Sequence, residues 1–361
     1  MAVSLAFGCH GLTLNLFDHM GSPMERFPGY GQMLKKRKPF LESLAREFQS
    51  PGGYRGVQLL HADDSACSKV LPENADYSCL SQDGGGAAVT LDGLGIANVF
   101  APSRVTMVSG QTIRAFPKTK IEEIFRGGVL IDGPGVQTMI ELGLGSLCGC
   151  KKLRRAGRLD SFGPISAEEL FHPKFGGAPR RYQSLFFGIG NMPVFYDFEL
   201  MPETESVCAL TEPDGQRSKG SAAVFENHLG GKVYMLAFDF REVDSGAFFS
   251  PLRVGQMHHA LEFLSGGEPD LLVSQNGGHM IPVRRDCDGF TLLGAFNLCL
   301  DPWTWEKFRF AFKKPVTEVY RLNEEGIWTE VEYESSFDGR CADLLLHQQV
   351  DFQFPLILKV T

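Results

Sequence analysis

From residue 56 to residue 267, segments with the apolar pattern of strands follow segments with the apolar spacing of helices. Runs such as "GVQLLHADDS" (56–65) and "GKVYMLAFDFR" (231–241) begin as near-continuous apolar stretches, typical of strands that are buried on both faces. Between such runs lie segments with helical spacing, including "GVQTMIELGLGSLCG" (135–149) and "PLRVGQMHHALEFLSGG" (251–267). Strands that alternate with helices predict a parallel sheet covered by helices on both faces.

Two further segments depart from this alternation. Residues 151–222 are rich in Pro, Gly, Phe and charge, and we expect an elaborated loop region with short strands there. After residue 269, β-branched and aromatic runs are separated by turn signals, among them Asp288-Gly289 and Glu325-Gly326, which are typical of hairpins. This pattern predicts a small all-β sandwich. Its aromatic residues from Trp303 to Phe312 alternate along the chain, which favours a buried sheet face over a sugar-binding platform.

The first fifty residues predict one strand, a long loop and one helix. "GLTLNLF" (11–17) has the composition of a strand, "GSPMERFPGYG" (21–31) that of a loop, and "QMLKKRKPFLESLAREF" (32–48) has helical spacing, with Pro39 at its start or at a kink. This is a single βα unit, and its strand has no partner nearby in the sequence. The fold class predicted overall is α/β plus all-β. The predicted domains are 1–54, 55–268 and 269–361.

Composition narrows the functional classes. The 361 residues are 43% hydrophobic and 22% charged, as in folded multi-domain proteins. A net charge of −8 argues against nucleic-acid binding, which needs clustered positive charge. The opening "MAVSLAFGC" lacks a basic region, and no later window has the roughly 20 apolar residues of a membrane span. Nine scattered cysteines without a CxxC pair indicate free thiols rather than zinc ligands, so we expect a cytoplasmic protein without metal or cofactor.

The best candidate site follows the first predicted strand. Asn15, Asp18 and His19 form a polar cluster where that strand ends, and parallel α/β sheets bind ligands at the carboxyl ends of their strands. The alternative is that Asn15 and Asp18 satisfy loop backbone groups and cap the next element. Asp63 and Asp64 also follow a strand, but adjacent residues on an extended chain point apart, which favours solvation or helix capping.

Two other motifs are weaker candidates. Cys148 lies in the glycine-rich "GLGSLCGC" (143–150), but a helical pattern precedes it where a nucleophile elbow needs a strand, so we expect a small buried side chain. His258 and His259 are neighbours on a predicted helix and face about 100° apart, which predicts surface histidines rather than shared metal ligands. The turn "GGVLIDG" (127–133) lacks the glycine order and the lysine of a phosphate-binding loop.

The order of these parts resembles the C-terminal half of family-42-type glycoside hydrolases, the β-galactosidase group. The resemblance covers nearly the whole chain and is carried by segments spread along it. These segments are "AFGCHGLTLNLFDHMGS" (6–22), "IFRGGVLIDGPGVQTMIELGLGSLCG" (124–149), "ENHLGGKVYMLAFDF" (226–240), "RVGQMHHALEFLSG" (253–266) and "GFTLLGAFNLCLDP" (289–302).

This resemblance implies a retaining enzyme built on a (β/α)8 barrel, of which residues 11–17 would be the eighth strand. The two catalytic glutamates would then precede Met1, so no residue of this chain is assigned a catalytic role. The loop after the eighth strand would contact a carbohydrate substrate through Asn15, Asp18, His19 and Glu25. The middle domain would resemble class I glutamine amidotransferases, usually without their triad, and would take part in forming a homo-oligomer, a trimer.

Two other functions stay open from the sequence. The chain is alternatively a non-catalytic protein for carbohydrate binding or oligomerisation, made of the middle domain and the sandwich. A third hypothesis is an amidotransferase-like hydrolase with Cys148 as its nucleophile.

Overall fold

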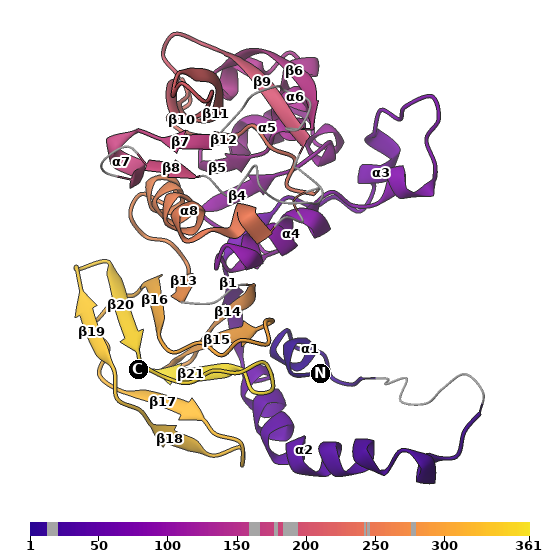
Figure 1. The fold of residues 1–361 in the computed structure, drawn as a ribbon, viewed down its shortest axis with the longest axis vertical. Helices are drawn as coiled ribbons and strands as arrows, with labels where there is room; N and C mark the ends of the chain where they lie inside the picture. Colours follow the sequence, from indigo (N-terminus) through magenta and orange to yellow (C-terminus); the bar gives the residue numbers. More distant parts are fainter. Residues whose placement is uncertain are drawn as a thin grey trace. The chain divides into compact units, whose positions relative to one another are not determined.

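The structure is a computed structural model of the chain. It describes residues 1–12, 21–158, 167–176, 180–182, 194–241, 243, 246–275 and 279–361. The chain divides into two compact units, each of which is described by itself: unit 1 comprises Met1–Arg55 and Val273–Thr361, and unit 2 comprises Gly56–Leu272. Figure 1 shows the elements of both.

Unit 2 is built on a nine-stranded sheet. In spatial order its strands are β3 (Asn98–Val99), β2 (Val57–Leu59), β4 (Val105–Val108), β5 (Gly128–Ile131), β12 (Lys232–Leu236), β11 (Arg217–Glu226), β10 (Glu205–Thr211), β7 (Ala167–Leu170) and β8 (Arg180–Tyr182). The strands from β3 to β12 run parallel, and the remainder continue the sheet in antiparallel pairs. A separate ribbon pairs β6 (Cys150–Arg158) with β9 (Val194–Leu200). Among the parallel strands the spatial order changes direction between β2 and β4, as in doubly wound sheets.

Helices cover both faces of this sheet. They are α4 (Gly84–Gly93), α5 (Lys118–Ile124), α6 (Gly133–Glu141), α7 (Pro173–Gly176) and α8 (Pro251–Leu264). Unit 2 also contains the short helix α3 (Ser65–Ser68) and the 3₁₀ turns η2 (Tyr77–Leu80), η3 (Thr112–Ala115), η4 (Gly145–Leu147) and η7 (Gly246–Phe249). Successive strand residues point to opposite faces. Leu130 therefore belongs to the core cluster that contains α4 and α8, whereas Val129 and Ile131 belong to the cluster that contains α5 and α6.

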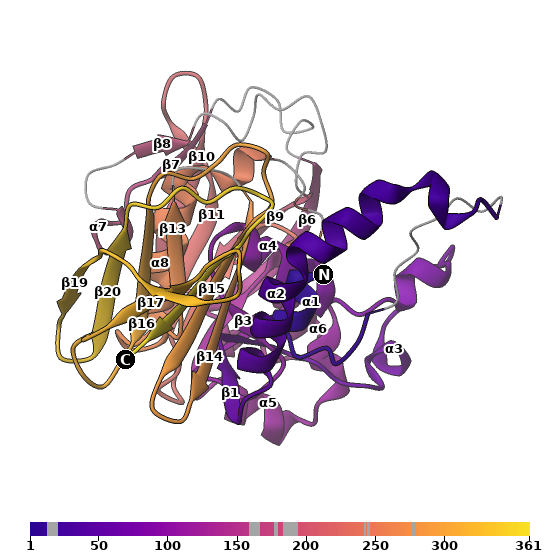
Figure 2. The same cartoon turned by 90° about the horizontal axis from the view of Figure 1, so that it is seen from below.

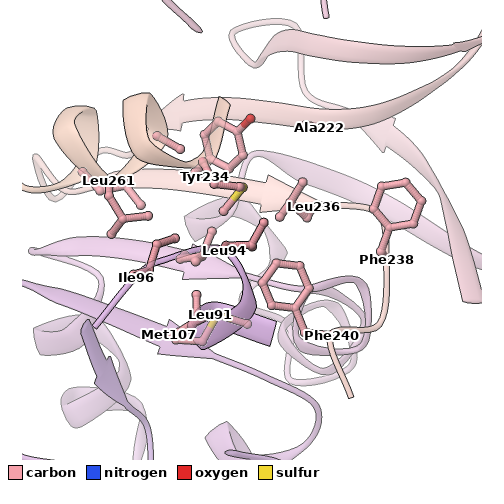
Figure 3. Packing of buried hydrophobic residues seen from close by; sticks show 14 of the residues in the cluster. Leu91, Leu94, Ile96, Met107, Ala222, Tyr234, Leu236, Phe238, Phe240 and Leu261 are labelled. Atoms are coloured by element: carbon pink, nitrogen blue, oxygen red, sulfur yellow. The ribbon is translucent and has the colours of Figure 1, made fainter. Parts of the chain in front are cut away.

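Figure 3 shows part of the first cluster. There Met107 and Leu236 from the sheet lie near Leu91 and Leu261 from the two helices. The apolar strand pattern in the sequence has its cause here, because both faces of each central strand are buried.

Unit 1 contains a six-stranded and a four-stranded sheet. The first has the order β1 (Gly52–Arg55), β14 (Met280–Cys287), β15 (Thr291–Asn297), β21 (Leu356–Val360), β17 (Val319–Leu322), β18 (Trp328–Glu330). The second has the order β13 (Leu272–Gln275), β16 (Glu306–Ala311), β20 (Cys341–Leu346), β19 (Glu334–Phe337), with β13 spanning the boundary between the units. The N-terminal elements of unit 1 are α1 (Ala2–Ala6), η1 (Met24–Arg26) and α2 (Pro28–Phe48).

The N-terminal helices pack on the six-stranded sheet, beside which Figure 2 shows them. Phe40, Leu44 and Phe48 of α2 are fully or almost fully buried, in one cluster with Leu292 of β15 and Ile357 of β21. The charged residues of α2 are at least partly exposed, whereas Ser43 is buried and donates to the carbonyl oxygen of Gly326 (2.8 Å). Segments from the two ends of the sequence therefore share one core.

Most predicted elements are present at their predicted positions, and the fold is mixed α/β with several sheets. The segment 21–31 differs from its prediction as a loop, because α2 already begins at Pro28. Pro39 lies inside this helix and not at its start. Proline fits the first turn of a helix, where its missing N–H would have no partner. The predicted hairpin turns are found with Gly289 and Gly326 at positive φ, where glycine carries no steric cost.

The prediction for residues 151–222 holds only in part for the residues that are described. β7 and β8 are short strands of 4 and 3 residues, whereas β6 is longer, with 9 residues, and β11, which continues to Glu226, has 10. Register shifts between β10 and β11, and between β6 and β9, interrupt the alternation of inward and outward side chains. A bulge of this kind removes the two-residue period by which a strand is recognised in a sequence.

Residues 13–17 of the predicted barrel strand lie outside the described residues, so its place in a barrel stays a prediction, as does the division into three domains. Among the described residues, no helix has the length and apolar character required to cross a membrane.

Candidate functional site at the carboxyl edge of the parallel sheet

The site predicted around the first strand is largely outside the described residues. Asn15, Asp18 and His19 fall in the range 13–20, which is not described. Glu25 is described; it lies in η1 with an exposed side chain. The grouping of the four residues and their contact with a sugar therefore stay predictions.

Polar side chains gather instead where the central strands of unit 2 end. Ser109 follows β4, Asp132 follows β5, and Asp239 and Arg241 follow β12, while Asp83 immediately precedes α4. Open parallel sheets bind their ligands at this edge, next to the point where the strand order reverses. These groups are therefore the natural candidates for chemistry in unit 2.

Asp132 forms the turn from β5 into α6. Its carboxylate accepts hydrogen bonds from the Ser109 hydroxyl (2.5 Å), from the Gly110 amide (3.1 Å) and, as an N-cap, from the Gly135 amide (2.8 Å). The side chain is fully buried, and burial, together with the negative charge of Asp239, raises the pKa of Asp132 to about 7. The sequence "IDGPG" thus encodes a capped helix start rather than a phosphate-binding loop.

Arg241 links the other two carboxylates. Its guanidinium donates to Asp239 through Nε (2.8 Å) and Nη2 (2.6 Å), and to Asp83 through Nη1 (2.8 Å). Burial opposes the charge of Arg241, yet its bonds to Asp239 and the neighbouring carboxylates raise its pKa. Asp83 also accepts from the Lys69 ammonium (3.0 Å) and the Gln111 amide (2.8 Å). Burial raises the pKa of Asp83, but these donors, Arg241 above all, lower it more, so this pKa lies below its usual value.

A tyrosine from the β6–β9 ribbon closes this region. A Cβ atom at Gly133 would lie 2.4 Å from Cδ2 of Tyr196, so only glycine lets the ring approach the start of α6. Burial and the charge of Asp239 raise the pKa of Tyr196. Each of the three carboxylates thus has donors of its own, and the cluster holds the strand ends together.

Among the described residues, neither the β5–α6 turn nor Cys148 has the features of a nucleophile. The β5–α6 turn is where an elbow nucleophile would stand, but Asp132 has an unstrained backbone (φ −85°, ψ 170°) and a fully bonded side chain. Cys148 follows η4 instead; it is completely buried, and burial raises the pKa of its thiol well above the usual value. A thiol in this environment is unreactive. The prediction of a small buried side chain is confirmed, and this burial argues against the hypothesis of a Cys148 hydrolase.

The remaining predicted residues have ordinary roles. Asp63 is exposed and pairs with His61 (2.9 Å), and Asp64 precedes α3 as its N-cap residue without a side-chain cap bond. His259 is exposed on α8 as predicted. His258, in contrast, is half-buried and bonds the carbonyl oxygen of Leu94 (2.9 Å), because its side of α8 faces α4. The described residues contain no group of three or more His, Cys, Asp or Glu side chains that could hold a metal ion.

Sequence reasoning missed Asp83, Asp239 and Arg241. A signal was present, since "FDFR" places a carboxylate and a guanidinium directly after the apolar strand "KVYML". The pairing of Arg241 with Asp83, which is far away in the sequence, could not be inferred from it.

Comparison with known proteins gives structural neighbours only. No protein-family model matches the sequence, and no curated protein matches it. The structure is similar to a β-galactosidase from Bacillus circulans sp. alkalophilus, at 11% identity over 95% of this chain and 46% of that one, with a TM-score of 0.48. A cold-adapted β-galactosidase from Rahnella is matched at 12% identity over 91% of this chain and 44% of that one, with a TM-score of 0.48.

A third match is a catalytic mutant of a GH42 β-galactosidase from G. stearothermophilus, at 9% identity over 88% of this chain and 42% of that one, with a TM-score of 0.41. The chain therefore spans less than half the length of these solved proteins. The family that the sequence resembles is thus also found among the structural neighbours.

Proposed function

We propose that this chain is the C-terminal portion of a retaining glycoside hydrolase that acts on β-galactoside-like sugars, with the catalytic glutamates upstream of it. The observation that carries the proposal is the series of family-like segments along nearly the whole sequence. Each one that falls in the described residues corresponds to regular elements. Residues 124–149 include β5 and α6, residues 226–240 include β12, and residues 253–266 lie in and just after α8.

The carboxyl edge of unit 2 is consistent with this assignment. Its carboxylates are bonded to neighbouring donors, and its elbow position carries Asp132 in place of a nucleophile. Unit 2 is then an accessory unit, and bond cleavage belongs to a barrel to which this chain would contribute its last βα unit. A retaining glycosidase needs two carboxyl groups about 5–5.5 Å apart on either side of the scissile bond. One strand and one helix cannot supply that arrangement.

The test compares two polypeptides on aryl β-galactosides. The chain as given should show no turnover above background, whereas a protein extended by the in-frame coding sequence upstream of Met1 should hydrolyse the substrate with retention. Turnover by the shorter chain that is abolished by Asp18→Asn or Glu25→Gln, but not by Glu73→Gln on the surface of unit 2, would contradict the proposal.

Trimer formation is also part of the proposal, by resemblance. Unit 2 has exposed apolar side chains that an oligomer interface could cover, among them Tyr77 (92% exposed), Val89 (66%) and Phe100 (62%). Light scattering on the purified chain should give three times the chain mass, and Tyr77→Ser with Val89→Ser should lower it. A monomer at micromolar concentration would remove this part of the proposal.

The alternative of a non-catalytic carbohydrate-binding protein is favoured by one separate observation, a polar cavity in unit 1.

A further inference from the structure

Unit 1 contains a cavity of about 590 Å³, within the range of sites for small molecules. It is lined by residues of the β17–β18 hairpin and of the segment that leads from β20 to β21. All of them belong to Val273–Thr361. The cavity therefore exists within one unit.

Arg321 supplies hydrogen-bond donors to this cavity. Within the described part of the chain its guanidinium makes one side-chain hydrogen bond, from Nη1 to Oε1 of Gln348 (3.0 Å). A guanidinium has five N–H donors in a fixed plane, so donors remain for a ligand or water. Gln348 and Arg321 both line the cavity, and their bond fixes the two polar planes relative to each other.

A buried carboxyl group lies next to Arg321. Glu306 of β16 is fully buried, and neither of its carboxyl oxygens has a hydrogen-bond partner of good geometry among the described residues. Burial raises the pKa of Glu306 to about 8, against the opposing charge of Arg321. An unsatisfied buried polar group is costly. Glu306 is one of several described residues with such buried atoms, and its charge, when it is ionised, acts on Arg321 of the cavity lining.

The charged side chains that line the cavity indicate which class of ligand it can bind. Its charged side chains are one guanidinium, Arg321, and four carboxylates: Glu324, Glu330, Glu332 and Asp351. This excess of negative charge repels phosphates and carboxylates. A neutral ligand with many hydroxyl groups suits the site, because each hydroxyl both donates to a carboxylate and accepts from a guanidinium or an amide.

One aromatic residue, Phe354, lines the cavity. Its ring is already in contact with other side chains, since the Arg37 guanidinium lies 3.6 Å from its centroid and Phe40 lies edge-on at 5.5 Å. The polar groups of the lining therefore carry the recognition of a ligand.

We propose that this cavity binds a neutral carbohydrate through Arg321, Gln348 and Asp351, without cleaving it. The inference goes beyond the proposed function, because it concerns binding in unit 1 and holds whether or not a longer protein hydrolyses galactosides.

The experiment titrates the full chain with lactose and with methyl β-galactoside by isothermal calorimetry. We expect binding with a dissociation constant on the order of 1 mM or tighter. Arg321→Lys, which keeps the charge but loses the planar donor fork, should weaken binding at least tenfold. The matched control is Arg309→Lys in β16, a half-buried arginine that is paired with Asp338 and Asp343 outside the cavity lining. It should bind as the unaltered chain does.

Gln348→Ala provides a second variant in case Arg321→Lys unfolds, and it should also weaken binding tenfold. Absence of binding by both sugars, or equal binding by the unaltered chain and the two cavity variants, would overturn the proposal. Binding of spermidine without binding of either sugar would overturn it too, by assigning the acidic cavity to polyamines. Each of these results leaves the hydrolysis test of the longer protein unaffected, so the two proposals fail separately.

Discussion

At the scale of single residues, Glu306 is a buried carboxyl group whose protonation affects the stability of unit 1. It is fully buried without a hydrogen-bond partner of good geometry among the described residues, and burial raises its pKa from 4.5 to about 8. Between pH 4.5 and pH 8, Glu306 is therefore protonated in the folded protein but ionised in the unfolded chain. The resulting stability is fully present below pH 4.5 and is lost as the pH rises toward 8.

Glu306→Gln removes this titration. Between pH 5 and pH 8.5, ionisation of Glu306 should lower the free energy of unfolding of the unaltered chain by about 2–4 kcal/mol. The variant should lose correspondingly less. Urea unfolding of both proteins at the two pH values measures the difference. An identical pH dependence would show that Glu306 is ionised, or solvated, in the folded state.

Gly133 is a second residue on which packing depends. Gly133→Ala places a methyl group 2.4 Å from the Tyr196 ring and should destabilise unit 2 by about 1–3 kcal/mol. Gly85→Ala is the matched control; it also lies in a helix, but its Cβ has nothing within 4 Å, so it should be neutral or slightly stabilising. Thermal unfolding separates the two, and equal shifts in melting temperature would contradict this account.

At the scale of elements, one buried ion pair connects β7 to α8. Glu168 accepts hydrogen bonds from Arg253 and from the Ser221 hydroxyl, and both charged side chains are essentially inaccessible. Arg253 also bonds Gln256 (2.7 Å) and lies over the ring of Phe248 (4.7 Å). The antiparallel extension of the sheet is tied to α8 by this ion pair and by the buried Gln256, which donates to Cys208 of β10 (3.1 Å).

Glu168→Gln would leave Arg253 buried without a counter-ion. It should cost about 3–5 kcal/mol of stability. Glu169→Gln, one residue along β7, breaks only the partly exposed pair with Arg217 (3.0 Å) and should cost less than about 1 kcal/mol. Denaturant unfolding of the two variants tests the contrast. Equal costs would show that the buried pair contributes no more than the exposed one.

The same elements show what the sequence could predict. The sequence predicts β4, β5 and β12 because each strand is apolar throughout and buried on both faces. It predicts α8 from its helical spacing and from the glycines at its end, Gly266 and Gly267. It does not predict the bulged strands β10 and β11, because a register shift cancels the two-residue period.

The sites were less predictable than the elements. Arg253 stands in a helix sequence where an arginine is expected to be exposed, and only its distant partner Glu168 explains its burial. The cavity residues Arg321, Gln348 and Asp351 form no motif, since hairpin and loop geometry alone brings them together.

At the scale of the whole molecule, the two units differ in continuity. Unit 2 is one continuous stretch with its own core clusters, whereas the six-stranded sheet of unit 1 buries a face under α2, from the other end of the sequence. A fragment of residues 56–272 should therefore fold alone, with a cooperative thermal transition. A fragment of residues 273–361 should expose the apolar face that holds Leu292 and Ile357, and should bind a hydrophobic dye or aggregate.

Adding a peptide of residues 1–55 to the second fragment should restore cooperative unfolding, because it returns Phe40, Leu44 and Phe48 to that face. Circular dichroism with and without the peptide measures this. If residues 273–361 fold stably alone, the contribution of α2 to the core has been overestimated.

The discontinuity of unit 1 also imposes an order on synthesis. A ribosome releases α2 and the edge strand β1 first, and all of Gly56–Leu272 emerges before the remaining strands of the sheet on which α2 packs. Domains fold as units while the chain is still being made, so unit 2 completes its core first. Until β15 and β21 are translated, the apolar stripe of α2 stays uncovered in the nascent chain. We expect that a chaperone that recognises amphipathic helices would bind the nascent chain during that interval.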